Sequence, residues 1–283
     1  MNSSIYKRIG NYHYDPTKPI GKGSYATVFV GFDEKNNNKK VAVKVLPIAM
    51  IASDEIVKEQ ILREVQVLRK IESKYVVKLI YAVQTTNNLY LILEYCDGHD
   101  LSTKLEQNKC LSEDEACLIV KQIAKAFVDL EKIRIDQKKM VLMHRDIKPA
   151  NILFHEGKIK LADFGFAKAV DDADKDKRLK HTLLGTPNYQ SPQLLNEDTY
   201  SAKCDVWATG IVLYEMIFGS RPWNAKSELY LLEAILFTPI EFNKEVREET
   251  KDLITKMLQV AEKDRLSWDE VYNHPALSKF NID

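Results

Sequence analysis

The sequence HRDIKPAN at residues 144–151 is followed by DFG at residues 163–165. An isolated aspartate in a loop is most often a turn or capping residue. Asp146, Asn151 and Asp163 together supply a carboxylate that can orient a hydroxyl group and accept its proton, and oxygen atoms of the kind that Mg²⁺ prefers. The two motifs in this order favour phosphoryl-transfer chemistry.

A glycine-rich stretch, GKGSYATV at residues 21–28, lies between two strand-like runs near the beginning of the chain. Gly21 and Gly23 allow backbone N–H groups to approach phosphate oxygens without a Cβ in the way. An ordinary hairpin turn explains the same stretch, and a dinucleotide fingerprint is disfavoured because no helix follows it. The stretch therefore indicates phosphate binding only in combination with other residues.

An alternating strand, VAVK at residues 41–44, places Lys44 where it could reach phosphate oxygens beneath the glycine-rich turn. A single lysine in a strand is usually a solvated surface charge. Glu64, however, lies in the middle of a helix-patterned segment. Its carboxylate could pair with Lys44 and hold the ammonium group against the α- and β-phosphates of a nucleotide.

With these motifs in one chain, the sequence resembles the eukaryotic protein kinase family from about Ile20 to Pro275. The resemblance implies an α+β, bilobal fold with an N-terminal antiparallel sheet that carries one long helix, and a mainly helical C-terminal lobe. We expect residues 1–95 to form the ATP-binding N-lobe and residues 96–283 to form the catalytic and substrate-binding C-lobe.

The hydrophobic pattern leads to the same division, because short β-type runs precede Tyr95 and helical patterns follow Gly98. The expected strands are residues 27–32, 40–46, 76–83 and 89–95. The expected helices are residues 53–71, with Ser53 as N-cap, and 112–132, 202–218, 226–236 and 247–260. The polar segments 134–139 and 171–180 are expected to be exposed loops, and residues 134–140 form a polar insertion that we interpret as a surface bulge.

By this resemblance, Asp146 is the expected catalytic base and Lys148 steadies the transferring γ-phosphate. Asn151 and Asp163 are the expected Mg²⁺ ligands. The implied cofactors are therefore ATP and Mg²⁺.

The resemblance also assigns the nucleotide contacts. Lys44 and Glu64 anchor the phosphates, and Leu93 is the gatekeeper beside the adenine. The expected nucleotide-binding residues are Ile20, Gly21, Gly23, Val28, Ala42, Lys44, Leu93, Glu94, Cys96, Asp100, Leu153 and Asp163. A core would equally require apolar residues at several of these places, so only the combined spacing supports ligand contact.

Two features resemble Ser/Thr-specific members of the family. Lys148 stands two residues after Asp146, and residues 185–189 read GTPNY, which is similar to a Ser/Thr-type substrate platform. Tyrosine specificity and a small-molecule kinase are both disfavoured. The motif sequences GKGSYATVFVG, HRDIKPANIL and DFGFAK are most similar to those of the autophagy-initiating ULK-type kinases. This resemblance implies protein substrates and autophagy-related signalling.

Activation-loop phosphorylation is a further expectation from the resemblance. Arg145 and Lys168 are placed to converge on Thr182, and a phosphate there would order the loop through charge-assisted hydrogen bonds. An upstream activating kinase is the implied partner. A single unmodified hydroxyl in a polar loop is the plain alternative.

The sequence departs from the family pattern at Gln193, which stands where a glutamate usually pairs with an arginine that Arg265 matches. Glutamine offers only a neutral hydrogen bond. We expect some loss of stability, but less than the roughly 3–5 kcal/mol for a broken buried ion pair, because the amide keeps an acceptor.

Composition limits the partners and the location. Lys plus Arg and Asp plus Glu both number 41, so net charge gives no reason to expect nucleic acid or an anionic membrane as the main partner. Membrane insertion is not expected, because the most apolar stretches, such as residues 89–93, are too short to span a bilayer. The N-terminal residues lack the apolar core of a signal peptide. The four cysteines show no CxxC spacing, and we expect free thiols and a cytoplasmic location.

The main alternative to an enzyme is a pseudokinase that acts as an ATP-binding scaffold or allosteric module. Such proteins usually lack one or more catalytic residues. This chain contains Lys44, Glu64, Asp146, Asn151 and Asp163. The complete set favours an active kinase.

Overall fold

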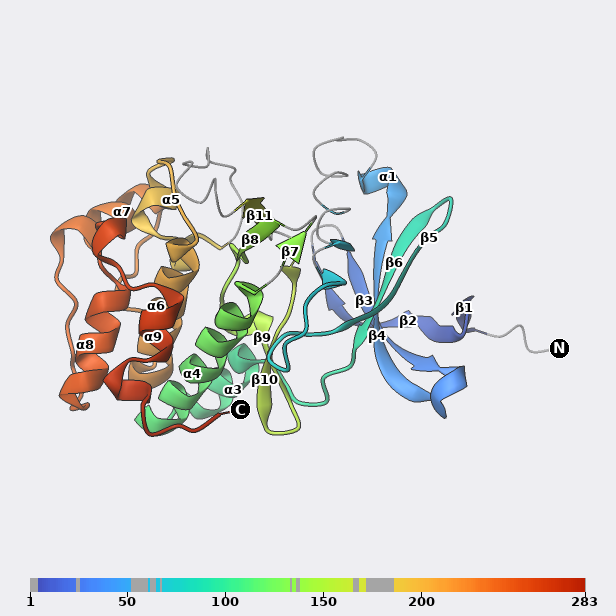
Figure 1. Ribbon diagram of the computed structural model, residues 1–283, viewed down its shortest axis with the longest axis horizontal. Coiled ribbons are helices and arrows are strands. Elements are labelled where there is room, and N and C mark those ends of the chain that lie inside the picture. The colour runs from blue at the N-terminus through green and yellow to red at the C-terminus, as the bar shows by residue number, and fades with distance from the viewer. Residues whose placement is uncertain are drawn as a thin grey trace. The chain divides into compact units, whose positions relative to one another are not determined.

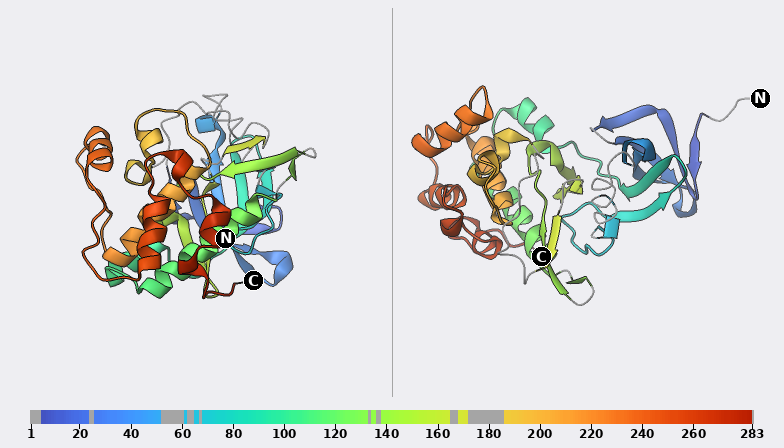
Figure 2. Two further views of the ribbon diagram at one scale, coloured as in Figure 1. Left: turned by 60° about the vertical axis from the view of Figure 1, so that its left-hand side comes forward. Right: turned by 90° about the horizontal axis from the view of Figure 1, so that it is seen from above.

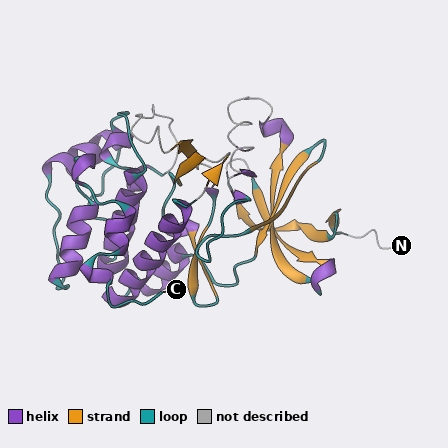
Figure 3. Cartoon of the chain, viewed as in Figure 1, coloured by secondary structure: helices purple, strands orange, loops and turns teal. Residues whose placement is uncertain are grey.

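The computed structural model describes residues 5–23, 26–51, 61, 65–66, 68–132, 134–135, 138–164, 168–171 and 186–282 (Figure 1). The chain divides into two compact units. The sheet unit comprises Met1–Glu72 and Val77–Asp97, and the helical unit comprises Ser73–Val76 and Gly98–Asp283. Figure 3 shows that strands predominate in the first unit and helices in the second.

The sheet unit is built on six antiparallel strands in the order β1-β2-β3-β4-β6-β5. Their bounds are β1 (Lys7–Ile9), β2 (Tyr12–Lys22), β3 (Thr27–Asp33), β4 (Lys39–Pro47), β5 (Leu79–Gln84) and β6 (Asn88–Glu94). The four strands expected from the sequence are present in β3 to β6, although the third begins at Leu79, three residues later than predicted. The sequence prediction did not include β1, and it gave no bounds for the strand-like run before the glycine-rich stretch, where β2 lies.

One face of this sheet carries a buried apolar cluster. In β4, Val41 and Val43 are buried, and Phe29 of β3 and Ile92 of β6 lie opposite Val43 in the ladder. Tyr14 of β2 packs on Phe29 with ring centroids 4.9 Å apart. Because side chains alternate along a strand, Ala42 and Lys44 lie on the other face of the sheet.

A helix was predicted over residues 53–71. Among these, the described residues Ile61, Val65 and Leu68 are helical and buried. The chain turns at residues 69–70, so the helix ends slightly before the predicted residue. The predicted N-cap Ser53 lies outside the described residues, and a short helix that the sequence prediction lacked, α1 (Ile48–Ile51), precedes it.

The helical unit contains the remaining described α-helices, which Figure 2 shows from two further directions. They are α3 (Leu101–Asn108), α4 (Glu113–Leu130), α5 (Pro192–Leu195), α6 (Lys203–Phe218), α7 (Glu228–Phe237), α8 (Glu248–Met257) and α9 (Trp268–Tyr272). Short 3₁₀ turns are η1 (Glu34–Asn36) in the sheet unit and η2 (Pro149–Asn151), η5 (Pro187–Tyr189), η6 (Glu262–Asp264) and η7 (Pro275–Leu277) in the helical unit. The four long helices predicted after Gly98 are all present.

Helices α4 and α6 form the centre of the helical unit. Ser112 caps α4 by accepting the N–H of Glu115, which explains why the helix begins where the sequence predicted. Phe127 of α4 stacks on Trp268 of α9, with ring centroids 4.1 Å apart and planes nearly parallel at 3°. Most of α6 is buried, consistent with its almost continuously apolar sequence.

Two small sheets complete the helical unit. A hairpin joins β9 (Ile152–His155) to β10 (Lys158–Leu161), and a second sheet has the order β11-β8-β7. Its strands are β7 (Arg134–Ile135), β8 (Lys138–Met143) and β11 (Lys168–Asp171).

The prediction of a loop over residues 134–139 was wrong, because residues 134–135 pair with residues 138–139 in the hairpin of β7 and β8. Among the described residues of the predicted bulge, 134–140, only Met140 pairs with β11. Lysine is depleted in strands, so residues 138–139 carried no local strand signal. The second predicted loop, residues 171–180, lies outside the described residues except for Asp171, which ends β11.

The α+β class with an N-terminal antiparallel sheet and a mainly helical second part is confirmed. Among the helices that the structure describes, none combines the length and the apolar character needed to cross a bilayer.

Candidate active site

A single buried carboxylate fixes the start of the HRDIKPAN loop, residues 144–151. Asp205 lies in the first turn of α6 and is 1% exposed. Its Oδ2 accepts the backbone N–H of His144 at 2.7 Å, and its Oδ1 accepts the backbone N–H of Arg145 at 2.8 Å. Burial raises the pKa of the Asp205 carboxyl group, and these hydrogen bonds oppose the shift. The anchored loop holds Arg145 in a left-handed backbone conformation, with φ of 65°.

The side chain of His144 ties this loop to the segment that follows β10. Its Nδ1 accepts the backbone N–H of Asp146 at 3.3 Å, so Nε2 is the atom that donates to the carbonyl oxygen of Ala162 at 2.9 Å. The imidazole also lies against the ring of Phe164, with centroids 4.6 Å apart. These contacts connect the HRDIKPAN loop to both neighbours of Asp163.

Asp146 lies at the centre of a compact polar cluster. Its carboxylate Oδ2 is 2.8 Å from Lys148 Nζ and accepts a hydrogen bond from Asn151 Nδ2 at 2.9 Å. Lys148 Nζ also donates to Thr186 Oγ1 at 3.0 Å, and that hydroxyl is 3.4 Å from Asp146 Oδ1. Asp146 is 4% exposed, so the cluster presents a carboxylate of fixed orientation with a cation at its side.

Asn151 and Asp163 are brought to the same end of the β9–β10 hairpin. Ile152 pairs with Leu161, and the N–H of Ala162 donates to the carbonyl oxygen of Asn151 at 2.9 Å. Asp163 follows directly, with a left-handed backbone at φ of 61° and an exposed position. A residue other than glycine in this conformation is uncommon and often marks a functional site.

The amide of Asn151 is oriented by its hydrogen bonds. Its Nδ2 donates both to the carbonyl oxygen of Asp146, at 2.8 Å, and to the carboxylate of that residue. The carbonyl oxygen of the side chain is therefore left as an acceptor, with no hydrogen-bond donor among the described residues. Amide and carboxylate oxygens from Asn151 and Asp163 fit Mg²⁺, which usually takes one or two protein carboxylates together with substrate phosphates and water. The described residues contain no group of three His, Cys, Asp or Glu that could hold a metal alone.

Arg145 was predicted to act in regulation together with Lys168 and Thr182. Its guanidinium donates to the hydroxyl of Tyr200 at 3.2 Å, and the residue is 8% exposed. Lys168 lies in β11 opposite Met143, which directly precedes the HRDIKPAN loop. Thr182 lies outside the described residues, as does the predicted partner of Lys44, Glu64.

In the sheet unit, four of the predicted nucleotide-binding residues share one face of the sheet. Val28 pairs with Lys44, and Ala42 pairs with Leu93. All four are half-buried and lie opposite the face that carries Val43 and the apolar cluster. The register thus groups three apolar side chains and one lysine without bringing them into the core cluster.

The other predicted residues of this unit lie at the ends of strands. Gly21 pairs with Val28, and Gly23 donates its N–H to the carbonyl oxygen of Ala26 at 2.8 Å, as in a hairpin turn. Ile20 is exposed in β2. Glu94 ends β6, with its carboxylate accepting the N–H of Lys78 at 3.2 Å, and Cys96 follows it as a half-buried residue.

Asp100 and Leu153, the predicted nucleotide residues of the helical unit, face each other across an isolated β-bridge. Asp100 is the N-cap of α3, and its Oδ1 accepts the N–H of Thr103 at 2.8 Å. Its carboxylate therefore already has a structural role at the helix terminus. Leu153 lies in β9, directly after Asn151 and Ile152.

Sequence reasoning missed three contributors to this site. Asp205 could have been found from the sequence, because it is an acidic residue in the first turn of an almost wholly apolar helix. Thr186 was recognised only as part of the GTPNY platform, and its contacts to Lys148 and Asp146 were not foreseen. Tyr200 gave no signal at all.

At the unusual position 193, the structure pairs glutamine with arginine as the sequence predicted. Arg265 Nη2 donates to Gln193 Oε1 at 2.9 Å, and Gln193 Nε2 donates to the carbonyl oxygen of Val260 at 2.7 Å. Burial lowers the pKa of Arg265 to about 10. Its guanidinium also donates to the backbone carbonyl oxygens of Gln259 and Lys203, so the buried cation is satisfied mainly by neutral acceptors.

Comparison with known proteins agrees with this geometry. The family model of the protein kinase domain matches residues 14–277. The serine/threonine-protein kinase atg1 of Dictyostelium discoideum is 32% identical over 98% of this chain and 41% of its own length. The serine/threonine-protein kinase ULK3 of Homo sapiens is 31% identical over 92% of this chain and 53% of its own length. The serine/threonine-protein kinase ATG1c of Arabidopsis thaliana is 30% identical over 92% of this chain and 35% of its own length.

These alignments cover almost all of the chain but only 26% to 53% of the curated relatives. The similarity includes the HRDIKPAN loop and both units. The chain belongs to the protein kinase family and is similar to its ATG1 and ULK members.

Proposed function

We propose that the chain is a Ser/Thr protein kinase that transfers the γ-phosphate of ATP to Ser or Thr hydroxyl groups of protein substrates. The observation that carries the proposal is the cluster in which Lys148 Nζ contacts both Asp146 and Thr186, at 2.8 and 3.0 Å. In this arrangement the carboxylate can orient an incoming hydroxyl group, and the ammonium group can bind the phosphoryl group that the hydroxyl attacks.

In the proposed reaction, Asp146 orients the substrate hydroxyl and accepts its proton. The hydroxyl oxygen forms a bond to the γ-phosphorus while the bond from that phosphorus to the β–γ bridging oxygen breaks, which releases ADP. Lys148 stabilises the negative charge on the γ-phosphoryl oxygens in the transition state. Thr186 keeps Lys148 beside Asp146.

The proposed cofactor site uses Asn151 and Asp163 as Mg²⁺ ligands. When bound, Mg²⁺ neutralises charge on the phosphates and holds them in line for transfer. The hydrogen bonds of Asn151 Nδ2 to Asp146 leave its carbonyl oxygen for this purpose. In the sheet unit, Lys44 with Glu64 anchors the phosphates, and Val28, Ala42 and Leu93 contact the adenine.

Regulation by phosphorylation of Thr182 is a second part of the proposal. Arg145 and Lys168 are the cations proposed to bind the phosphate, and an upstream kinase would add it. Support comes from β11, whose pairing with β8 places the backbone of Lys168 opposite Met143, two residues before Arg145. A Thr182→Ala variant should lose the activation that treatment with an activating kinase produces, and unchanged activation would contradict this part.

The experiment that tests the main proposal measures phosphate transfer from ATP to the chain itself and to a mixture of Ser, Thr and Tyr peptides, with and without Mg²⁺. The phosphorylated residues are identified by mass spectrometry. The wild type is compared with Asp146→Asn and Asp163→Asn, and with Asp264→Asn as a matched exposed control. We expect Mg²⁺-dependent transfer to Ser and Thr that falls by about 10² to 10⁴ in the first two variants and persists in the control.

The alternative is an ATP-binding scaffold without catalysis. Measurable ATP binding with no transfer, even after treatment with an activating kinase, would favour it and overturn the main proposal. ATP binding by itself does not separate the two, because a scaffold can retain it.

We propose that this kinase acts in the cytoplasm, in autophagy-related signalling. This proposal rests on similarity to the ATG1 and ULK kinases over most of the chain. Replacing the kinase domain of the Dictyostelium discoideum relative with this chain should retain autophagic flux in cells that lack the native gene. An active chimera that leaves flux absent would contradict this setting while leaving the kinase proposal intact.

A further inference from the structure

Helix α7 (Glu228–Phe237) carries large apolar side chains on its exposed side as well as on its covered side, with Glu228 and Glu233 as its charged residues. Leu231 and Ile235 are 4% and 5% exposed and face the rest of the helical unit. Four other apolar side chains point to solvent. These are Leu229, Tyr230, Leu236 and Phe237, with exposed fractions of 73%, 63%, 47% and 79%. A surface helix normally presents mainly polar and charged residues to solvent, so this exposure of four large apolar side chains is unusual.

The exposed side chains belong to one continuous surface, which we call the α7 face. Positions 229, 230, 233, 236 and 237 follow the spacing of a single side of an α-helix. From Leu229 to Phe237 this surface extends for about 12 Å, given a rise of 1.5 Å per residue. It is long enough to contact two turns of a partner helix.

A groove runs beside the α7 face. Figure 1 shows α5 next to α7, and a groove of about 920 Å³ lies along the two. Its lining includes Leu195, Glu197, Ala225, Lys226, Leu229 and Leu232. The elements that border it are helices, 3₁₀ turns and irregular turns, and none is a strand. A partner therefore cannot add to a sheet edge here and must be recognised through side-chain packing.

The charges around this surface are mainly negative. Glu228 and Glu233 are exposed on α7, and Glu197 lies on the groove wall. None of the three carboxylates has an ion-pair partner among the described residues, and Lys226 is the one cation among the described residues that line the groove. The surface thus combines apolar area with unneutralised negative charge.

This charge distribution decides between possible occupants. A second copy of the chain in a two-fold contact would bring the α7 carboxylates of both copies together, and like charges across an interface are unfavourable. An anionic membrane surface would be repelled for the same reason. A partner with basic residues would satisfy the carboxylates and cover the apolar side chains at once.

We propose that the α7 face and the adjoining groove bind a basic amphipathic helix of another protein, with apolar side chains at helical spacing and Lys or Arg at its flanks. Phe237 and Leu229 act as the apolar anchors, and Glu228 and Glu233 select the positive charge. The groove lining also includes Pro187 and Asn188, which directly follow Thr186, but not Asp146, Lys148 or Thr186 itself. The proposed binding therefore does not require phosphate transfer.

The test uses two fluorescein-labelled peptides of about 18 residues, long enough to form a helix. Both carry Leu and Phe at i, i+3, i+4 and i+7, and they differ only in having Lys or Glu at the polar positions. Fluorescence anisotropy measures their binding to the wild-type chain at low and high salt. The variants are Leu229→Ser with Phe237→Ser, and Glu233→Lys. Ile80→Ser in β5 and Glu245→Lys are the controls, since both residues are exposed and lie outside α7.

We expect the Lys peptide to bind at least about tenfold more tightly than the Glu peptide, with a difference that falls at high salt. The double serine variant and Glu233→Lys should each weaken the Lys peptide by about tenfold or more, while both controls bind as the wild type does. Unchanged melting temperatures confirm that the exposed substitutions leave the fold intact.

Equal affinity for the two peptides, or binding that survives the α7 substitutions, would overturn the proposal. Absence of binding by the Lys peptide would overturn it as well. A wild-type dimer in analytical ultracentrifugation that the double serine variant dissociates would instead show that a second copy covers the face.

Discussion

The buried carboxylate of Asp205 accepts the backbone N–H of His144 at 2.7 Å, between residues 61 positions apart in the sequence. Asp205 also accepts the N–H of the next residue along, so one side chain of α6 fixes two consecutive peptide groups of the HRDIKPAN loop. The position of Asp146 therefore depends on a buried residue of another element, 59 positions along the chain.

Replacing Asp205 with Asn should destabilise the chain and impair transfer. The amide oxygen can accept one of the two N–H groups, but the amide nitrogen then faces the other, which is left buried without an acceptor. We expect a loss of about 1.5–3 kcal/mol in the free energy of unfolding, measured by urea denaturation, and a larger fractional loss of kcat than of substrate affinity. Asp264→Asn is the exposed control. Full stability and activity in Asp205→Asn would show that the loop is held by other contacts.

Thr186 should act through the placement of Lys148. Its hydroxyl accepts from Lys148 and lies near Asp146, so Thr186→Ala removes the contact while Thr186→Ser preserves it. We expect kcat to fall by about tenfold to a hundredfold in the alanine variant, because small misplacements of catalytic groups are costly. The serine variant should recover most of the activity. Steady-state kinetics with a Ser/Thr peptide measures both, and equal losses in the two variants would contradict a role for the hydroxyl.

Gln193 should contribute to stability in spite of replacing a charged residue. In Gln193→Ala, the guanidinium of Arg265 loses a hydrogen-bond acceptor and the carbonyl oxygen of Val260 loses a hydrogen-bond donor. We expect the free energy of unfolding to fall by about 2 kcal/mol. Gln193→Glu gains an ion pair with Arg265 but loses the hydrogen bond to Val260. We therefore expect it to lie within about 1 kcal/mol of the wild type. Thermal and urea unfolding of the wild type and the two variants measure these differences in the free energy of unfolding. A strongly stabilised Gln193→Glu variant would show that the hydrogen bond to Val260 contributes little stability.

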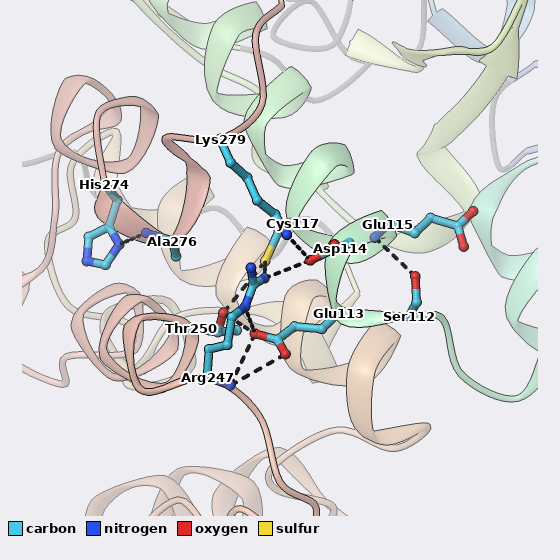
Figure 4. Close-up of polar contacts among 10 residues, drawn as sticks. All are labelled: Ser112, Glu113, Asp114, Glu115, Cys117, Arg247, Thr250, His274, Ala276 and Lys279. Atoms are coloured by element: carbon cyan, nitrogen blue, oxygen red, sulfur yellow. Dashed lines mark hydrogen bonds and ion pairs between the residues drawn. The ribbon is translucent and has the colours of Figure 1, made fainter.

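The acid stability of the helical unit should depend on Glu113 at the beginning of α4 (Figure 4). Its Oε1 accepts from Arg247 Nε at 2.7 Å and from Thr250 Oγ1 at 2.5 Å. Burial pushes the pKa of Glu113 upward, but these hydrogen bonds outweigh it and hold the pKa below its ordinary value of 4.5. A carboxyl group with a lowered folded-state pKa stabilises the protein above its unfolded-state pKa, and this contribution is lost as the pH falls through the folded-state value.

The difference in unfolding free energy between the wild type and Glu113→Gln should therefore be constant near neutral pH and shrink as the pH falls below about 4.5. Urea unfolding at a series of pH values measures it. Glu245→Gln, at an exposed position, should show no such trend. A difference that does not change with pH would mean that the contacts of Glu113 do not depend on its charge.

Local patterns were sufficient for most of the regular structure. The alternation in residues 41–44 predicted β4, and Ser112 before an apolar periodic segment predicted the start of α4. These signals work because strand alternation and helix capping involve residues close in sequence. The β7–β8 hairpin was mispredicted although it pairs locally, because residues 138–139 are both lysine, which is depleted in strands. Only the pairing of residues 140–143 with β11 depends on a distant part of the chain.

The sequence by itself determined which chemical groups are available for the proposed reaction, because the HRDIKPAN and DFG motifs contain those residue types in that order. Only the tertiary structure decided how those groups are held. Asp205 anchors the loop from α6, Thr186 joins Lys148 to Asp146, and Asn151 turns its amide nitrogen toward Asp146. Each of these depends on the directions of individual hydrogen bonds, mostly between residues far apart in the chain, and such directions exist only after the elements have packed.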